Sequence, residues 1–376
     1  MDTVNVETND NNQNVKPSED AKPNLKNEQP KLEKKELISL AQYNRALLKH
    51  LPKGFLKRDP LRLLWSVFFI GTSAAIVYSF LNFELPIVLK VVLGLFMGML
   101  LGGNAFLAHE VLHGSIVKNK KIQDIYGFIG FAPFLISPTY WKYWHNHLHH
   151  GNTQLLYKDP DAFPTKMIYK RSKFMRWAFK FTPGSGTKMS YFYFFWWFSF
   201  QAVLNQAYMR FGNKMWNGMN HKRVTIEFTC QIALALAYVN LVGPSNWIYL
   251  VVLPFMIQNY TVMSYISTNH NISPYTRIND PLVNSLTVTN NPLLEFLHLN
   301  FGYHTEHHLF PNMPMSKAKI VSKKLQELYP DRYMIMPKSK ALKMLYSTPR
   351  IYKNRETLVH PVTNQEFETL RKENLV

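Results

Sequence analysis

Histidine is unevenly distributed along this chain, and its spacing is the strongest chemical signal in the sequence. Fourteen histidines occur among 376 residues, and eight of them form the patterns H-x-x-x-H, H-x-x-x-H-H and H-x-x-H-H. A neutral imidazole nitrogen is a common ligand for transition metals. The patterns therefore predict metal binding.

The first cluster places His109 and His113 four residues apart at the end of an apolar block. Residues at i and i+4 share a helix face, so these two imidazoles can bind one metal ion. Glu110 between them completes a literal match to the zinc-protease pattern H-E-x-x-H. That interpretation needs a third ligand and a single zinc, and it does not explain the other clusters.

The second cluster contains His145, His149 and His150. On an α-helix His145 and His149 share a face, and His150 adds a ligand about 100° round the axis. His147 faces away from His145, so we expect it to lie at the surface or to support a ligand.

The third cluster, His304, His307 and His308, is expected to converge on one helical face. Together the clusters offer eight nitrogen ligands, more than one four-coordinate zinc can use. They suit two metal ions with four or five ligands each. Ligand type alone does not choose between iron, copper and zinc.

Four apolar blocks are available to position these clusters, each near the roughly 20 residues that a bilayer requires. They cover residues 63–83, 86–108, 224–242 and 247–267. The short turns within each pair lack Lys and Arg, whereas residues 114–223 and the C-terminal part are rich in them. By the positive-inside bias we expect an all-α integral membrane protein, with four transmembrane helices in two hairpins and a cytoplasmic helical cap carrying the metal site.

The remaining segments are predicted from composition. We expect residues 1–36 to be a disordered polar tail without a signal peptide, and 37–62 to be an amphipathic segment at the membrane surface. The catalytic domain should cover 63–316, and 317–376 should form a cytoplasmic helical tail. The aromatic block 191–211 would separate the histidine clusters if it spanned the membrane, so we expect it, like 122–136, to be interfacial or re-entrant.

Charge and cysteine content exclude several classes of function. The formal net charge is +19, but no nucleic-acid-binding motif accompanies it, so we expect no nucleic-acid partner. The single cysteine, Cys230, rules out a disulfide framework, a cysteine zinc site and an iron–sulfur cluster.

The order and spacing of the three histidine clusters around two apolar hairpins resemble the membrane fatty acid desaturases. The segment 302–311, Gly-Tyr-His-Thr-Glu-His-His-Leu-Phe-Pro, is similar to that family's third histidine box, and the Lys-Asp-Pro-Asp segment 158–161 is similar to the stretch after its second box. The resemblance covers roughly residues 60–330. It implies two non-haem iron ions held by histidines, and a further ligand just past the fourth span, which would be His270.

The ligand set implied by the resemblance is His109, His113, His145, His149, His150, His270, His304, His307 and His308. Three departures place the chain nearest to acyl-lipid or bacterial desaturases. The first box has three residues between its histidines, Ile266 occupies the position of a family asparagine, and His304 stands where front-end desaturases usually carry Gln. No His-Pro-Gly-Gly motif of a fused cytochrome b5 domain occurs.

Neighbouring polar side chains are expected to orient such ligands and raise their basicity. The candidates are Glu110, His147, Asp159, Asp161, His298, Asn300 and Glu306.

The resemblance implies an acyl desaturase that uses O2 and two electrons to introduce a double bond into a lipid-linked or thioester fatty acyl chain. A separate donor such as ferredoxin, flavodoxin or cytochrome b5 would supply the electrons. The enzyme would lie in a bacterial plasma membrane or in the endoplasmic reticulum, with its active site on the cytoplasmic face. A di-iron lipid or carotenoid hydroxylase or ketolase, and a non-enzymatic membrane metal-binding protein, remain alternatives.

Overall fold

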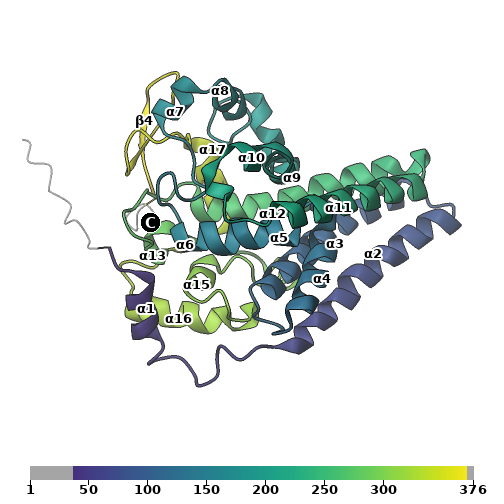
Figure 1. Ribbon diagram of the computed structural model, residues 1–376, viewed down its shortest axis with the longest axis horizontal. Coiled ribbons are helices and arrows are strands. Elements are labelled where there is room, and N and C mark those ends of the chain that lie inside the picture. The colour runs from purple at the N-terminus through teal and green to yellow at the C-terminus, as the bar shows by residue number, and fades with distance from the viewer. Residues whose placement is uncertain (1–36, 371–376) are drawn as a thin grey trace, which may run out of the picture. The chain divides into compact units, whose positions relative to one another are not determined.

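Four long helices dominate the computed structural model, which describes residues 37–370 (Figure 1). Each is long and apolar enough to cross a membrane: Pro60–Asn82, Ile87–Leu112, His221–Val242 and Ile248–His270. All four lie within a few residues of the apolar blocks expected from the sequence. The predicted disorder of residues 1–36 lies outside the described residues, as do residues 371–376.

Shorter elements connect and follow these helices. The α-helices are α1 (Leu40–Leu47), α2 (Leu64–Asn82), α3 (Ile87–Leu112), α4 (Lys120–Phe131), α5 (Pro138–Trp141), α6 (His150–Asn152), α7 (Lys166–Arg171), α8 (Lys173–Phe179), α9 (Trp197–Leu204), α10 (Arg210–Gly212), α11 (His221–Val242), α12 (Leu253–His270), α13 (Pro281–Asn284), α14 (Pro292–Leu297), α15 (His304–Leu309), α16 (Ala318–Leu328) and α17 (Lys338–Ser347). The 3₁₀ and π segments are η1 (Pro60–Leu63), η2 (Ala132–Phe134), η3 (Lys142–His149), η4 (Lys188–Phe195), η5 (Asn205–Met209), η6 (Lys214–Trp216), η7 (Pro244–Asn246), η8 (Ile248–Val252) and η9 (Met315–Lys317). The strands are β1 (Thr287–Thr289), β2 (Ile335–Pro337), β3 (Thr357–Val359) and β4 (Glu366–Glu368).

The helices α3 and α12 form the inner pair of the long set, and α2 and α11 form the outer pair. In the most apolar stretch of each helix, the buried share of residues is 61% for α3 and 56% for the helix that ends in α12. The corresponding share is 22% for each outer helix. The outer helices instead expose large apolar side chains such as Val67, Leu81, Leu234 and Leu236. Exposed apolar faces of this length suit contact with lipid.

Glycines let α3 and α12 approach closely. A Cβ on Gly94 would lie 2.4 Å from the carbonyl oxygen of Tyr249 on η8, which leads into α12, and a Cβ on Gly102 would lie 2.9 Å from Thr261 Cγ2 on α12. Gly98 lies one helical turn from each of these glycines and faces α12 in the same way. Small residues at this spacing are typical of close helix pairs in membranes. Gly102 therefore serves helix packing.

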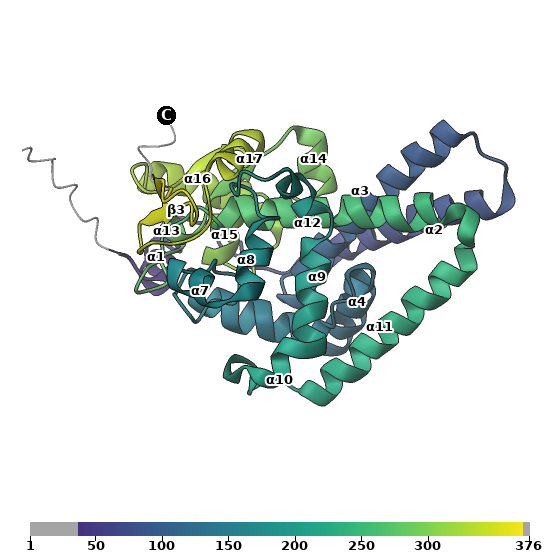
Figure 2. The same ribbon diagram turned by 90° about the horizontal axis from the view of Figure 1, so that it is seen from above.

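The two pairs of long helices differ in how they pack. Figure 2 shows α11 and α12 spreading apart from the turn that joins them. Glu227 on α11 accepts hydrogen bonds from Ser137 and Thr139, and Gln231 donates to the Ile136 carbonyl oxygen at 2.9 Å. The far end of α11 therefore packs on the connection between η2 and α5.

The aromatic block 191–211 is broken into short pieces rather than one long helix. It runs through η4, α9, η5 and α10, and the backbone leaves helical geometry at Trp196, with φ −151° and ψ −20°. The helix α4 has only 12 residues, and Leu135 after it is left-handed, with φ 57°. Neither segment is among the described helices long enough to span a membrane.

Within residues 37–62, the helix α1 packs on other parts of the protein. Its apolar face is covered by protein: Tyr43 and Leu47 are fully buried. The Tyr43 ring packs edge-on against Tyr329, and Phe55 packs in the same way against Phe310, with ring centres 5.1 and 5.0 Å apart. The apolar side chains of this segment thus pack on residues just after α15 and α16, and its placement at a membrane surface stays a prediction.

The C-terminal part contains short strands as well as helices. Residues 37–370 belong to one compact unit. The strand β2 pairs in parallel with β1, and β3 pairs antiparallel with β4. The chain is therefore mostly helical rather than all-α, because short backbone pairings tie its C-terminal part to the segments before α15.

Candidate metal centre

The three histidine clusters and His270 meet at the ends of the inner helices. The first cluster ends α3, and His270 ends α12. The second cluster lies on η3 and α6, and the third on α15. The structure therefore brings together segments separated by up to about two hundred residues of sequence.

Nine imidazoles divide into two groups that could each hold one metal ion. Within each group the candidate ligand atoms all lie within 4.8 Å of one another. Group one contains His109, His113, His145, His150 and His307, and group two contains His149, His270, His304 and His308. These are the nine residues of the ligand set that the family resemblance implied.

The second cluster divides between the groups because η3 is a π-helix. The amide of His150 donates to the carbonyl of His145, five residues back. This wider turn puts His145 and His150 on one face, where their Nε2 atoms lie 3.2 Å apart. His149 consequently points into group two. His145 and His149 do remain close, since together with Asp161 they form a third, overlapping group whose candidate ligand atoms lie within 4.8 Å of one another.

The third cluster also divides, which corrects the expectation of a single convergent face. His304 and His308, one turn apart on α15, direct Nε2 atoms into group two at a separation of 3.2 Å. His307 points into group one, where its Nε2 lies 3.0 Å from that of His150. The groups are adjacent, since the rings of His150 and His308 stack with centres 4.3 Å apart.

Burial keeps most of these imidazoles in the neutral form that binds metals. Desolvation, with a smaller contribution from the neighbouring imidazoles, lowers the pKa of His113, His150, His307 and His308 well below its usual value. Several imidazole nitrogens face the same point, and a metal ion can bind all of them whereas a proton cannot. The clustering of many neutral imidazoles favours a metal ion over a proton.

The hydrogen bonds of group two fix the tautomers that a metal ion requires. A carbonyl oxygen only accepts, so His270 Nδ1 must donate to the Asn284 carbonyl at 3.0 Å. The Thr153 hydroxyl donates to the His149 carbonyl, so its oxygen accepts from His308 Nδ1 at 3.2 Å. The Nε2 atoms of His270 and His308 therefore present lone pairs to each other at 3.1 Å. A cation between them relieves that repulsion, so the donor set fits a metal ion.

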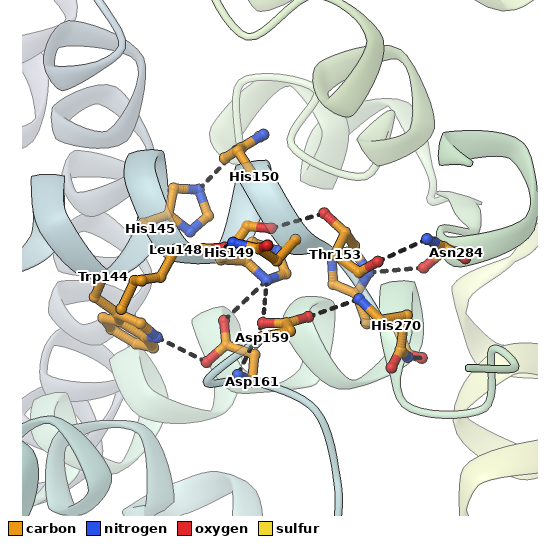
Figure 3. A network of polar contacts seen from close by, with 12 residues as sticks. Trp144, His145, Leu148, His149, His150, Thr153, Asp159, Asp161, His270 and Asn284 are labelled. Carbon is orange, nitrogen blue, oxygen red and sulfur yellow. Dashed lines mark hydrogen bonds and ion pairs between the residues drawn. The ribbon is translucent and has the colours of Figure 1, made fainter. Parts of the chain in front are cut away.

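Two of the predicted orienting carboxylates lie beside a histidine (Figure 3). Asp159 Oδ1 accepts from His149 Nδ1 at 3.0 Å, and Asp161 Oδ2 lies 3.4 Å from the same nitrogen. Asp161 also accepts from the Trp144 indole at 2.9 Å. Asp159 thus fixes the His149 tautomer, and Asp161 links that histidine to an aromatic wall.

The other predicted orienting residues contact different partners. Glu110 pairs with Arg62, with Nη2 and Oε1 2.5 Å apart, and accepts from the Met315 amide at 3.0 Å. Glu306 is fully buried and bonds Thr287 and Tyr333. These two carboxylates connect segments around the centre rather than orienting its ligands.

Within residues 37–370, the remaining three candidates make no hydrogen bond to a clustered histidine. His298 Nδ1 is bonded to the Tyr265 hydroxyl at 2.9 Å. Asn300 adopts a left-handed backbone, with φ 61°, in the turn before α15. His147 lies at the surface, one of the two positions expected for it, and packs on Tyr143 with ring centres 5.2 Å apart.

Sequence reasoning missed Thr153 and Asn284, which bond histidines of group two. Asn284 also donates to the Thr153 carbonyl at 2.6 Å, which joins the two supports. Neither residue belongs to a histidine pattern. Asn284 acts on His270 through its main-chain carbonyl, for which sequence carries no signal.

An apolar cavity of about 220 Å³ leads toward the histidines. A smaller cavity of about 30 Å³ lies beside them, lined in part by His109, His145, His149, His270 and His304. Both are lined by Trp144, Asp161, Phe198 and Ile266, so the two spaces adjoin. The larger one is also lined by the partly exposed Phe174 and Met209. A mostly apolar cleft beside a few polar groups is typical of a ligand site.

A family model described as "Fatty acid desaturase" matches residues 86–340, which include α3, all three histidine clusters and His270. The chain belongs to the fatty acid desaturase family. The four long apolar helices and the two histidine groups fit a membrane-bound, metal-dependent member of this family.

The chain is similar to three plant proteins, each named "Omega-6 fatty acid desaturase, chloroplastic". It is 24% identical to the Glycine max protein over 75% of the chain and 66% of that relative. For the Arabidopsis thaliana protein the values are 24%, 75% and 63%, and for the Spinacia oleracea protein 22%, 82% and 69%. The chain spans about two thirds of the length of these relatives.

Proposed function

We propose that this desaturase introduces a carbon–carbon double bond into a fatty acyl chain, using O2, two electrons and two iron ions held by the nine histidines. The observation that carries the proposal is the convergence of two adjacent imidazole groups beside an apolar cavity. The family membership and the names of the relatives support the acyl substrate.

The overall reaction balances without any further reagent. A –CH2–CH2– unit, O2, two electrons and two protons give –CH=CH– and two water molecules. Two irons held by the histidines would supply the activation of O2 that removes hydrogen from an unactivated methylene, a step beyond any side chain here.

The chain's own residues bind, orient and exclude water. The tautomers of His149, His270 and His308 are held by Asp159, Asn284 and Thr153, which directs their lone pairs to one point. Apolar and aromatic side chains such as Phe198 and Ile266 line both cavities. We infer that they hold the acyl chain beside the histidines and keep bulk water away from the reaction.

The test is gas chromatography of total fatty acids from a host that expresses the gene, with His307→Ala as the matched inactive control. A new unsaturated fatty acid that depends on His307 supports the proposal. A hydroxylated or ketone product in its place would assign the chain to the hydroxylase alternative. Bound iron without any oxygen-dependent product would favour a metal-binding protein that is not an enzyme.

We also propose that a separate acidic protein supplies the electrons from the histidine-bearing side. The loop 114–223 carries exposed cations, including Lys170, Arg171 and Lys173 on α7 and α8. Complementary charge speeds encounter and is screened by salt over about 8 Å at physiological ionic strength. Reversing these three charges in neutral detergent should raise the apparent KM for a soluble donor and leave bound iron unchanged. An unchanged KM would favour the alternative that these residues contact the anionic membrane surface.

We further propose that the histidines and both termini lie on the cytoplasmic face, because the short turns between the long helices lack Lys and Arg. A cysteine introduced at Ser245, in the turn between α11 and α12, should react with an impermeant reagent from outside the cell. A cysteine at Ser316 should not. Labelling of Ser316→Cys from outside would overturn this topology.

A further inference from the structure

The two histidine groups differ in how firmly the protein holds their ligands. In group two, three of the four imidazoles donate Nδ1–H to a protein acceptor, namely the Asp159 carboxylate, the Asn284 carbonyl and the Thr153 hydroxyl. The fourth, His304, has a buried Nδ1 without a partner in the described part of the chain. Group two is therefore largely set to receive a metal ion before the ion arrives.

Group one lacks comparable support from the protein. One ring nitrogen each of His109, His113 and His150 is buried and has no hydrogen-bond partner among the described residues. Its histidines meet chiefly one another, with Nε2 of His145 lying 2.9 Å from that of His109 and 3.2 Å from that of His150. An imidazole without an acceptor can adopt either tautomer, so part of the binding free energy must be spent on selecting one.

The supports of group two also form a connected unit. The Asn284 side chain donates to the Thr153 carbonyl at 2.6 Å and accepts from Thr276 at 3.0 Å. The Gln154 side chain donates to the His270 carbonyl at 2.5 Å, and the Gln154 backbone amide donates to Asp159 at 2.8 Å. These bonds tie the loop after α6 to the end of α12 independently of any metal.

We propose that the centre loads in order, with group two binding its metal ion first and more tightly, and that Thr153 is a positioning residue for this tight site. The cause is the pre-set tautomer and orientation of His270, His308 and His149. The inference rests on the metal-binding part of the proposed function and not on the acyl substrate. Orienting partners of metal-bound histidines typically contribute about 10- to 100-fold in affinity.

The test is a titration of full-length, metal-free protein in detergent with Co²⁺, followed by the visible absorption of the bound ion. We expect two phases, a tight first equivalent and a weaker second. His304→Ala should abolish the tight phase, and His109→Ala should abolish the weak one. A single phase of two equal sites, or the opposite assignment by these variants, would overturn ordered loading.

The role of Thr153 is tested in the same titration. Thr153→Val should weaken the tight phase about 10- to 100-fold and leave the weak phase unchanged, whereas Thr153→Ser should restore it. The matched control is Thr305→Val, because Thr305 is equally buried but its hydroxyl has no partner within residues 37–370. Equal effects of the two valine variants would show a purely structural cause.

Two further outcomes separate this inference from the function on which it rests. If Thr153→Val does not fold, as judged by its thermal unfolding, Thr153→Ala is titrated instead, and wild-type affinity in that variant would refute the role. Absence of any Co²⁺ binding by the wild-type protein would contradict the proposed metal centre itself. Two equal sites in an enzyme that still forms a double bond would refute only the order of loading.

Discussion

Replacing Asp159 should weaken metal binding by an amount that depends on how many hydrogen bonds the new side chain keeps. Asp159 accepts three N–H groups: Oδ1 bonds His149 Nδ1 and the Asp161 amide, each at 3.0 Å, and Oδ2 bonds the Gln154 amide at 2.8 Å. The side chain is almost fully buried, so water cannot replace these bonds.

Asparagine has one acceptor oxygen, so its best orientation is the one that keeps the larger number of hydrogen bonds. With that oxygen in the Oδ1 position, His149 and Asp161 keep their bonds, but the amide nitrogen then faces the Gln154 N–H. One buried donor thus loses its acceptor, which costs about 1–3 kcal/mol. The bond to His149 also loses its charge and about half its strength.

The expected result for Asp159→Asn is a loss of about 1–3 kcal/mol in the free energy of unfolding and a loss of about tenfold in metal affinity. Asp159→Ala removes all three bonds, so its metal affinity should fall by about 100-fold. Thermal unfolding, bound iron per chain and the desaturation rate measure these effects. The control is Glu366→Gln, an exposed acid on β4 paired with Lys353, for which no change is expected. Full bound iron in Asp159→Ala would refute the reasoning.

Three further perturbations test the packing around the centre. His147→Ala should keep bound iron and most activity because the side chain is exposed, and loss of iron would contradict its placement outside both groups. Arg62→Met leaves the buried Glu110 carboxylate without its cation and should lower the unfolding free energy by about 3–5 kcal/mol. The double replacement of Arg62 by Met and Glu110 by Leu should recover only part of this loss, because the Met315 amide then lacks its acceptor. A neutral single variant in thermal unfolding would contradict the pair. Gly98→Ala puts a Cβ 2.6 Å from the Ile257 Cβ and should destabilise the protein by about 1–3 kcal/mol. The control Gly71→Ala meets no atom within 4 Å and should not destabilise it. Equal melting temperatures for the two variants would contradict the close contact of α3 and α12.

The four long apolar helices were predictable from composition because a bilayer imposes a minimum apolar length on any segment that crosses it. The gathering of the three histidine clusters was predictable as well, since several imidazoles at short spacing beside apolar helices are typical of metal ligands. The interruption at Trp196 was expected only indirectly, from the need to keep the clusters together.

Local periodicity left open what covers the apolar face of α1. The pattern that places Tyr43 and Leu47 on one apolar face indicates that the face is buried, but it does not indicate what covers it. Protein and lipid are equally apolar partners for such a face. In the structure Tyr43 is buried and packs on Tyr329, a contact with a distant part of the chain that the local pattern does not specify.

The division of the nine histidines into two groups was decided by the tertiary structure alone. In sequence, His145, His149 and His150 carry no mark of a π-helix, and an α-helix would pair the first two. The extra residue in the turn of η3 pairs His145 with His150 and sends His149 to group two. Likewise Asn284 supports His270 through its backbone carbonyl, which every residue type possesses. The sequence determines which atoms are available to bind a metal, but the packing of distant segments determines which of them share one ion.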